Sequence, residues 1–283
     1  MKWGNLNLMS DISKFIEHIS FIQSQTNKAL SKIPLKPELT SYFYDPISYV
    51  LKGKGKRLRP VLVHLAGQAF NAQPDDLMKA GVAAELLHNF SLVHDDIMDN
   101  DFLRHGKKTI HEKWDFSTAI LAGDGIYTMA QIILNRLPEK TIEISRYFNN
   151  TTLEICEGQA LDKEFENNQT ITESMYLDMI DKKTGALLGA SAVLPMIYNG
   201  ESKETIQKFE KFGRCLGKGF QIHDDLLEIT ANTKIMGKSL GSDIIEGKQT
   251  MLVIKARKNF PEEWMRLLNN TNELRFIDNI ASF

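Results

Sequence analysis

Hydrophobic positions recur every three or four residues along most of the chain, which is the period of a helix with one buried face. The clearest stretch starts at Pro74, where a proline followed by two acidic residues is typical of a first helical turn, and continues to about Met98. Similar periodicity predicts helices over residues 12–30, 118–137, 142–161, 174–198, 204–229 and 264–280. Strand signals are scarce, because no Asn-Gly or Asp-Gly turn joins two alternating β-branched runs. The pattern therefore predicts an all-α protein.

Neither a composition shift nor a low-complexity linker divides the chain, so we expect residues 1–283 to form a single large helical bundle. A hydrophobic content of 42% is enough for a large core. The formal net charge of −2 disfavours a globally basic nucleic-acid binder. The longest apolar segment, residues 185–198, is shorter than the roughly 20 residues that span a bilayer, which disfavours stable membrane insertion.

The cysteine content indicates a reducing compartment. Cys156 and Cys215 are the only two cysteines, so the chain has neither a disulfide framework nor a CxxC pair for zinc or redox chemistry. The first 15 residues are interspersed with polar side chains and lack the apolar stretch of a secretion signal. These features favour a cytoplasmic location.

Two acidic motifs of the same form occur, each at the end of a predicted helix. The first is His94-Asp95-Asp96-Ile97-Met98-Asp99, and the second is His223-Asp224-Asp225-Leu226-Leu227-Glu228. Because both copies share the preceding histidine and two apolar residues between the acids, chance is a poor explanation for the repeat. We expect the two helix ends to face each other across a bundle.

The spacing of the first motif crowds its carboxylates. Asp95 and Asp96 lie four and three residues before Asp99, so all three share one edge of a helix. Two unit charges about 4 Å apart repel by roughly 4 kcal/mol at an effective dielectric of about 20, which disfavours burial without cations. Oxygen ligands without cysteine favour Mg²⁺. A solvated acidic helix end is the alternative, but it leaves the apolar residues inside both motifs unexplained.

Basic residues supply the complementary charge. The loop at residues 53–60 combines glycines with lysines and arginines, and Arg104 follows the first acidic motif. Such side chains bind phosphate oxygens, although an ordinary solvated charge run is possible for either segment alone. Further donors in the second half of the chain are Lys183-Thr184, Gln221, Lys238 and residues 241–248. Acids for a metal together with bases for phosphate indicate diphosphate chemistry.

The chain resembles the trans-isoprenyl diphosphate synthases of the polyprenyl synthetase family, most of all those that make geranylgeranyl and farnesyl diphosphate. Motifs in the family's order cover nearly the whole chain: Gly55-Lys56-Arg57-Leu58-Arg59-Pro60, Glu85-Leu86-Leu87-His88, Asp95 to Asp99, Gly158-Gln159 with Asp162, Lys183-Thr184, Phe220-Gln221-Ile222 with Asp224-Asp225, and residues 237–248. The resemblance implies an isoprenoid-synthase bundle with a central cavity, active as a homodimer. It implies a condensation of isopentenyl diphosphate with an allylic diphosphate.

The resemblance also implies roles for individual residues. Three Mg²⁺ ions would be bound by Asp95, Asp99 and Asp224, with Asp96 and Asp225 completing the motifs. The allylic diphosphate would be held by Arg104, Lys183, Gln221 and Lys238. Isopentenyl diphosphate would be held by Lys56, Arg59, His88 and the residue at position 105. Thr184 and Gln221 would stabilise the allylic cation, and Lys248 would support the metal-bound end.

Two positions depart from the family's pattern. His105 stands where the family usually has a second arginine that contacts isopentenyl diphosphate, so we expect a weaker pocket there. The second acidic motif ends in Glu228 rather than aspartate, a longer side chain that still reaches a metal through water.

The helix below the first motif is expected to set product length. Ser91 lies one turn beneath Asp95 and leaves room, with Leu87 a further turn down. Phe90 lies five residues before the motif, and an aromatic residue there resembles the twenty-carbon producers. We therefore predict geranylgeranyl diphosphate as product, with farnesyl diphosphate as the alternative. Phe90 could instead be a plain core residue.

Three other functions are weighed against this one. A class I terpene cyclase needs a second metal motif that the residues around Glu228 do not form. A di-iron bundle would use the Glu85-to-His88 spacing but needs a second copy, which is absent from the sequence. A non-catalytic regulatory subunit of a prenyl diphosphate synthase generally lacks the acidic motifs, and both are present here.

Overall fold

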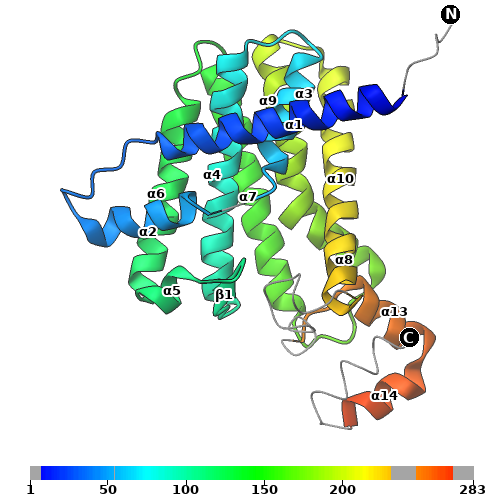
Figure 1. Ribbon diagram of the computed structural model, residues 1–283. Helices are drawn as coiled ribbons and strands as arrows, with labels where there is room; N and C mark the ends of the chain where they lie inside the picture. The colour runs from blue at the N-terminus through cyan, green and yellow to red at the C-terminus, as the bar shows by residue number, and fades with distance from the viewer. Residues whose placement is uncertain (1–7, 54, 231–246, 270–283) are drawn as a thin grey trace, which may run out of the picture.

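Helices make up nearly all of the computed structural model, which describes residues 8–53, 55–230 and 247–269 (Figure 1). The helices are α1 (Leu8–Ser31), α2 (Ser41–Leu51), α3 (Leu58–Gln68), α4 (Pro74–Met98), α5 (Ile110–Lys113), α6 (Phe116–Leu134), α7 (Thr141–Phe165), α8 (Glu173–Ile180), the π-helix η1 (Asp181–Gly185), α9 (Ala186–Asn199), α10 (Lys203–Thr230), α13 (Met251–Asn259) and α14 (Pro261–Asn269). Two short strands are β1 (Leu103–Arg104) and β2 (Lys107–Lys108). The all-α prediction is confirmed.

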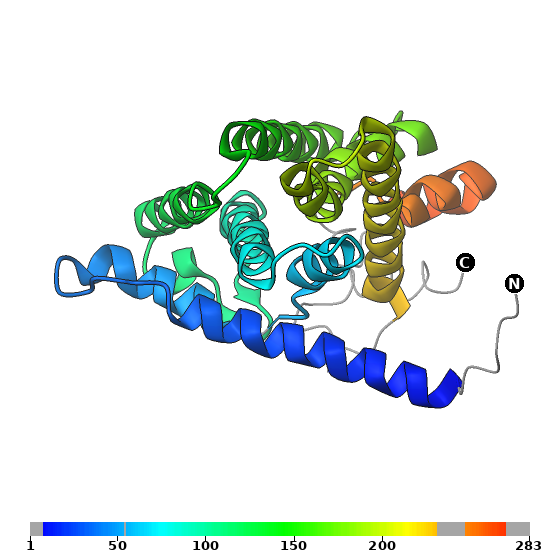
Figure 2. The same ribbon diagram turned by 90° about the horizontal axis from the view of Figure 1, so that it is seen from above.

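The long helices form an antiparallel bundle. Helices α4, α7 and α10 run in one direction and end at the same end of the molecule, whereas α3, α6 and α9 run the opposite way (Figure 1). Helix α1 crosses the outside of the bundle, where it packs against α3 and α4 (Figure 2). The C-terminal ends of α4 and α10, which carry the two acidic motifs, therefore lie at one end of the bundle.

Helix α4 is the centre of the hydrophobic core. Leu86 and Leu87 on α4 are fully buried, as are Ile126 on α6 and Phe148 on α7. Because α4 is enclosed by α3, α6 and α9, the middle of the helix is mostly apolar, and its charges gather mainly in the first and last turns. The acidic motif is thus fixed to the most rigidly packed helix of the bundle.

The helices predicted over residues 12–30, 118–137, 142–161 and 204–229 are present, whereas α3, α5 and α13 were not predicted, and the predicted loop at residues 53–60 is helical from Leu58. The helix at Pro74–Met98 has the predicted bounds. The continuous helix predicted over residues 174–198 is wrong, since the π-helix Asp181–Gly185 interrupts it. Helix α2 was not predicted because Pro46 lies inside it, and proline normally ends a helix. The last predicted helix, residues 264–280, begins earlier, at Pro261, and its part beyond residue 269 lies outside the described residues.

A β-hairpin follows the first acidic motif, and the sequence did not predict it. Leu103 pairs with Lys108 and Arg104 with Lys107, so the turn has only His105 and Gly106. Both turn residues have positive φ, 51° and 74°. Two-residue hairpins need this left-handed backbone, and histidine adopts it more readily than most residues. His105 is therefore fixed at the tip of the turn, with Arg104 directly before it.

Glycines allow helices α9 and α10 to touch. A Cβ on Gly217 would lie 2.7 Å from the Cα of Gly185, and one on Gly213 would lie 2.7 Å from the Cα of Gly189. These four glycines form a small-residue seam that brings the second acidic motif's helix against the π-helix.

Two findings bear on location. Cys156 and Cys215 are free thiols, as predicted. Within the described ranges, α6 is the one helix long and apolar enough to cross a membrane, and 44% of that stretch is buried in the protein. The longest apolar segment of the sequence, residues 185–198, is too short to meet this test. A core helix of a globular protein passes the same test of length and composition, so α6 is weak evidence for membrane insertion.

Candidate active site

Asp95 is the least compensated carboxylate of the first motif. It is half-buried, and no residue that the structure describes forms a hydrogen bond or ion pair with its side chain. Burial raises the pKa of Asp95 to about 6, and the Asp99 charge adds to this, while Lys183 and Arg104 oppose it. The group is therefore poised to accept a cation.

Asp99 is paired with two lysines from distant segments. Its side chain is 5% exposed, and Lys248 Nζ lies 3.2 Å from Oδ2 while Lys163 Nζ lies 3.4 Å from Oδ1. Although burial disfavours the charged form, Lys248 and Lys183 hold the pKa of Asp99 below its ordinary value. Lys248, predicted to support the metal-bound end, thus lies beside Asp99. Lys163 was missed, because its position on α7 gives no sequence signal of this partner.

Asp96 has a different role from its neighbours. Arg104 in the hairpin donates Nε to Asp96 Oδ1 at 2.7 Å and Nη2 to Asp101 Oδ2 at 2.9 Å. Burial disfavours the Arg104 charge, but Asp96 and Asp101 raise its pKa overall. The predicted crowding of three aspartates is therefore wrong for Asp96, which helps to fix Arg104 beneath the motif. Arg104 remains close enough to affect the charge of Asp95.

Lys183 occupies the π-helix and reaches the first motif from the opposite side. Its Nζ lies 2.5 Å from Asp162 Oδ2 on α7, and Asp162 and Asp95 raise the pKa of Lys183 despite its burial. The backbone approaches α7 so closely that a Cβ on Gly158 would lie 2.3 Å from Lys183 N. π-Helical turns are frequent at functional sites because they re-aim one side chain. Here the turn and Gly158 together aim Lys183 at Asp95.

A chain of hydrogen bonds links the π-helix to the second motif. Thr184 Oγ1 donates to Gln221 Oε1 at 2.9 Å, and Gln221 Nε2 donates to Asp225 Oδ1 at 2.9 Å. Tyr176 on α8 donates its hydroxyl to Asp225 Oδ2 at 2.5 Å and is 1% exposed. Thr184 and Gln221 are thus brought together as predicted. Tyr176 was missed, since no local pattern relates it to Asp225.

The residues predicted to bind isopentenyl diphosphate form a basic cluster. Burial, followed by the charges of Arg59 and Arg104, lowers the pKa of His88 well below its ordinary value. Partial burial and the charges of Arg104, Arg57 and Lys56 lower the pKa of His105. Burial and the neighbouring cations thus both favour the neutral form of the two histidines. Such a cluster attracts a multivalent anion.

Asp224 joins the second motif to this basic cluster. Burial raises the pKa of Asp224, while Lys56, His223 and Arg59 oppose the rise. Burial lowers the pKa of Arg59, and the charges of Glu85 and Asp224 counter it. Arg59 on α3 thus interacts electrostatically with Glu85 on α4 and Asp224 on α10. Glu85 lies in the middle of α4, before the first motif, so this contact ties the second motif to the body of α4.

Arg57 anchors the junction between the loop that carries Lys56 and the first turn of α3, which carries Arg59, and its role was missed. Its side chain donates to Glu85 Oε1 at 2.7 Å, Asn27 Oδ1 at 2.8 Å and Gly53 O at 2.6 Å. The residue is 6% exposed and has a left-handed backbone with φ of 48°. The run of cations in the sequence does not show which of them is a buried anchor and which of them could bind phosphate.

The side-chain amide of Gln159 is buried, and its polar atoms lack hydrogen bonds within the described residues. Neither its side-chain nitrogen nor its oxygen has a hydrogen-bond partner among the described residues. It lies on α7 one turn before Asp162, the partner of Lys183. Unsatisfied buried amides are rare in native proteins and frequently mark a place for a ligand or water.

The donor set suits divalent cations held jointly with phosphate oxygens. Among the residues that the structure describes, no group of three or more His, Cys, Asp or Glu side chains could hold a metal alone. Burial raises the pKa of Asp95 and of Asp224, and neither side chain forms an ion pair within the described part of the chain. Mg²⁺ commonly uses one or two carboxylates plus substrate phosphates and water, so these carboxylates fit it.

Some predicted positions lie outside the described residues. These are Lys238, the side chain of Glu228, and residues 241–246.

The comparisons agree with this geometry. Residues 40–279 match the family model described as polyprenyl synthetase. A geranylgeranyl diphosphate synthase from Methanosarcina mazei is 43% identical over 216 residues, covering 75% of this chain and 67% of the relative. A geranylgeranyl pyrophosphate synthase from Geoglobus acetivorans is 44% identical over 225 residues, covering 78% and 70%. A crystal structure of a geranylgeranyl pyrophosphate synthase superposes with a TM-score of 0.83 at 34% identity, covering 94% of this chain and 82% of the other. With both acidic motifs at one end of an all-α bundle and a match along most of its length, the chain belongs to the polyprenyl synthetase family.

Proposed function

We propose that the protein is a prenyltransferase that condenses isopentenyl diphosphate with an allylic diphosphate, head to tail. The observation that carries this proposal is the presence of two separate cationic groups beside the carboxylates. Lys183 and Lys248 accompany Asp95 and Asp99, and Arg59 and Lys56 accompany Asp224. Two diphosphates need two such groups, and each has its own side of the site.

We propose geranylgeranyl diphosphate as the main product. Relatives from Methanosarcina mazei, Geoglobus acetivorans and Sulfolobus acidocaldarius that are 40–44% identical carry names of this activity. Phe90 supports the same length, because its ring lies in the wall between α4 and α6, 5.3 Å from the ring of Tyr127. The farnesyl alternative is supported by one relative, from Mycobacterium bovis, at 36% identity.

We propose that Asp95, Asp99 and Asp224 hold Mg²⁺, with three ions present when substrates are bound. When bound, these ions neutralise the diphosphate and make it a better leaving group. The resemblance, rather than an ion in the structure, supports this number. The lysines that now pair with Asp99 would then turn their charge toward the diphosphate.

The protein's own side chains would bind and orient the two substrates and stabilise the charges that develop on them. Lys183 and Arg104 would hold the allylic diphosphate while its carbon–oxygen bond breaks, because fixed positive charges stabilise the negative charge that develops on the leaving group. Thr184 and Gln221, fixed by Asp225 and Tyr176, would present oxygen dipoles to the allylic cation. The double bond of isopentenyl diphosphate then attacks, and a proton leaves to the released diphosphate, so no side chain is assigned as base.

The remaining proposals concern assembly and location. We propose one catalytic domain over residues 1–283, acting as a homodimer in the cytoplasm. Exposed apolar side chains on the outer helices support a second copy: Ile120 and Leu121 on α6, and Ile142 and Leu153 on α7. The free thiols support a reducing compartment.

The test is a product assay on the purified protein. It is incubated with Mg²⁺, labelled isopentenyl diphosphate and each allylic starter of five, ten or fifteen carbons, and products are identified by mass spectrometry. A linear twenty-carbon diphosphate is expected, and Asp95→Asn should abolish it while leaving the circular dichroism spectrum unchanged. Absence of product with every starter would support the non-catalytic subunit, and a cyclic hydrocarbon would support a cyclase.

A further inference from the structure

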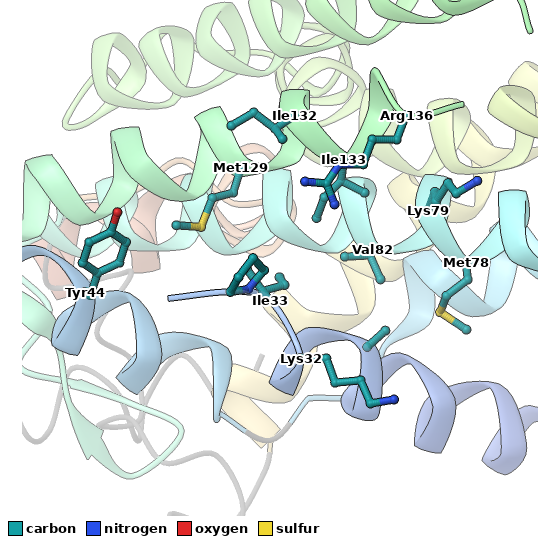
Figure 3. Close-up of a pocket in the computed structure, with 12 residues that line it drawn as sticks. Lys32, Ile33, Tyr44, Met78, Lys79, Val82, Met129, Ile132, Ile133 and Arg136 are labelled. Carbon is teal, nitrogen blue, oxygen red and sulfur yellow. The ribbon is translucent and has the colours of Figure 1, made fainter. Parts of the chain in front are cut away.

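A cavity of about 400 Å³ lies on a face of the bundle away from the residues described above (Figure 3). It is formed where the end of α1 and the following loop meet α2, the first half of α4 and the last turns of α6. Its size falls within the range of roughly 300–1,000 Å³ that is typical of small-molecule sites. None of the residues assigned to the diphosphate site lines it.

Helix geometry separates this cavity from the acidic motif. Val82, which lines the cavity, lies about 20 Å along α4 from Asp95 and roughly 140° around the helix, at about 1.5 Å and 100° per residue. Ser91 and His88, by contrast, lie within about 40° of Asp95. The cavity therefore opens on a different side of α4 from Asp95, Ser91 and His88.

The floor of the cavity is apolar and adaptable. Met78 and Val82 of α4 face Met129 and Ile133 of α6, with Ile33 closing one side (Figure 3). Methionine side chains are unbranched and flexible, so they fit around irregular hydrocarbon groups. A chain with methyl branches is the kind of ligand that such a floor accepts.

The rim of the cavity is cationic. Lys32, Lys79 and Arg136 line it, and each comes from a different segment of the chain. Lys79 is bound to Asp76 at 2.8 Å, whereas the side chains of Lys32 and Arg136 form no hydrogen bond or ion pair with any residue that the structure describes. Figure 3 shows the guanidinium of Arg136 beside Ile133, above the apolar floor. The rim thus keeps at least two uncompensated positive charges beside a hydrocarbon-lined space.

We propose that this cavity is a second, non-catalytic binding site for a long-chain prenyl diphosphate, the protein's own product. The occupant must combine a flexible hydrocarbon tail with a head of more than one negative charge, and this product does so. A fatty acid has only one charge and leaves one cation of the rim unmatched. The identity of the ligand rests on the proposed function, since the enzyme generates the compound on a different side of the same helix.

Equilibrium binding of an unreactive analogue tests this assignment. The analogue is geranylgeranyl thiolodiphosphate, with sulfur in place of the bridging oxygen, used below its micelle concentration. Two molecules are expected to bind per chain of the parent protein. Arg136→Glu should weaken one of the two sites by at least about tenfold, because a carboxylate then faces the diphosphate. Lys183→Ala should weaken the other and leave the cavity site intact.

Controls identify what the cavity recognises. Lys208→Glu reverses an exposed charge on α10, 71% exposed, and should leave both sites unchanged. A five-carbon thiolodiphosphate, too short to cover the apolar floor, should bind only at the catalytic site. Met129→Trp, which fills the floor, should remove the same site as Arg136→Glu.

The proposal would be overturned by one molecule bound per chain in the parent protein, or by two sites that both persist in Arg136→Glu and Met129→Trp. Displacement of the analogue from the cavity by an equal concentration of myristate would also overturn it, by showing a general lipid site. Product formation measured on the same samples distinguishes failure of the cavity proposal from failure of the proposed function. An active enzyme with a single site contradicts the inference alone.

Discussion

Arg57 and Glu85 form an ion pair in the interior of the protein, with Nη1 and Oε1 2.7 Å apart and side chains 5% and 4% exposed. The pair joins the loop before α3 to the middle of α4. The other carboxylate oxygen of Glu85 is buried with no partner among the described residues, and its charge acts on Arg59. One carboxylate therefore fixes the anchoring Arg57 and also acts on Arg59, which we propose binds phosphate.

Breaking this pair should damage both stability and one substrate site. Arg57→Met is expected to lower the free energy of unfolding by about 3–5 kcal/mol, because a buried carboxylate then lacks its partner. The KM for isopentenyl diphosphate should rise at least tenfold, roughly 1.4 kcal/mol, as Lys56 and Arg59 lose their fixed loop. The KM for the allylic substrate should change little. Urea unfolding and steady-state kinetics measure these effects.

A surface pair provides the matched control. Lys182 and Glu157 also form an ion pair, but their side chains are 38% and 48% exposed. Lys182→Met should leave the unfolding midpoint and both KM values unchanged within experimental error. Equal losses in the two variants would contradict a special role for the interior pair.

Gly158 should be intolerant of even one methyl group. In Gly158→Ala the new Cβ would lie 2.3 Å from Lys183 N, so α7 and the π-helix must move apart. Strain of this kind costs about 1–3 kcal/mol of stability, and a displacement of about 1 Å at Lys183 lowers turnover by roughly a hundredfold. Thermal unfolding and kcat measure the two effects.

Gly219 supplies the comparison for that variant. It lies within α10, is exposed, and has open space around the position of a Cβ. Gly219→Ala should therefore stabilise the protein by about 0.5–1 kcal/mol through the helix propensity of alanine. Full activity in Gly158→Ala would show that the close approach is not needed for the site.

The hydroxyl of Tyr176 should matter for turnover more than for binding. Tyr176→Phe removes one hydrogen bond to the Asp225 carboxylate, worth about 1.5–3 kcal/mol for a charged acceptor. Gln221 and Thr184 lose their fixed orientation with it, so kcat should fall by about tenfold while the KM for isopentenyl diphosphate stays constant. A rise in the KM for isopentenyl diphosphate with unchanged kcat would contradict the assignment of these hydrogen-bonded residues to the allylic substrate.

The parts of the fold that the sequence predicted are those with strong local signals. The bounds of α4 follow from Pro74, its acidic first turn and a long apolar period, all of which act within a few residues. The two acidic motifs were placed at helix ends for the same reason. Their position at one end of the bundle then follows from the antiparallel order of the helices.

The parts that were missed depend on contacts between distant segments. The π-helix at Asp181–Gly185 exists where Gly158 and Gly217 let two other helices approach, and a helical pattern cannot reveal this. The pairing of Arg104 with Asp96 depends on a hairpin with His105 at a left-handed position, a turn signal weaker than Asn-Gly. Burial distinguishes Arg57 from its cationic neighbours, and charge patterning alone carries no information on burial.

The stability of the fold should fall as the pH drops below about 6.5, partly through His64. Burial lowers the pKa of His64, against a weaker opposing effect of the hydrogen bond to Pro60 O at 2.8 Å. Below the unfolded-state pKa near 6.5 the unfolded chain binds a proton that the folded protein excludes, so unfolding becomes more favourable as pH falls toward the folded pKa. His64→Gln should reduce this slope by up to about 1.4 kcal/mol per pH unit. Urea unfolding at pH 7.0, 6.0 and 5.5 measures the free energy of unfolding of both proteins. The same pH dependence in His64→Gln and in the parent protein would contradict the prediction.

Phe90 is expected to limit the length of the product. Its ring packs 4.7 Å from that of His94 and 5.3 Å from that of Tyr127, closing the space between α4 and α6 below the acidic motif. Phe90→Ala removes one of the rings packed there, so the main product should lengthen from twenty to twenty-five carbons or more, since the growing chain no longer meets the Phe90 ring. Tyr127→Phe keeps the ring and removes only the hydroxyl that bonds Asn149, so its product should stay at twenty carbons. Chromatography of the dephosphorylated products at equal substrate ratios resolves these lengths. Identical products from Phe90→Ala and the parent enzyme would show that Phe90 is a core residue and that the chain grows along another face of α4.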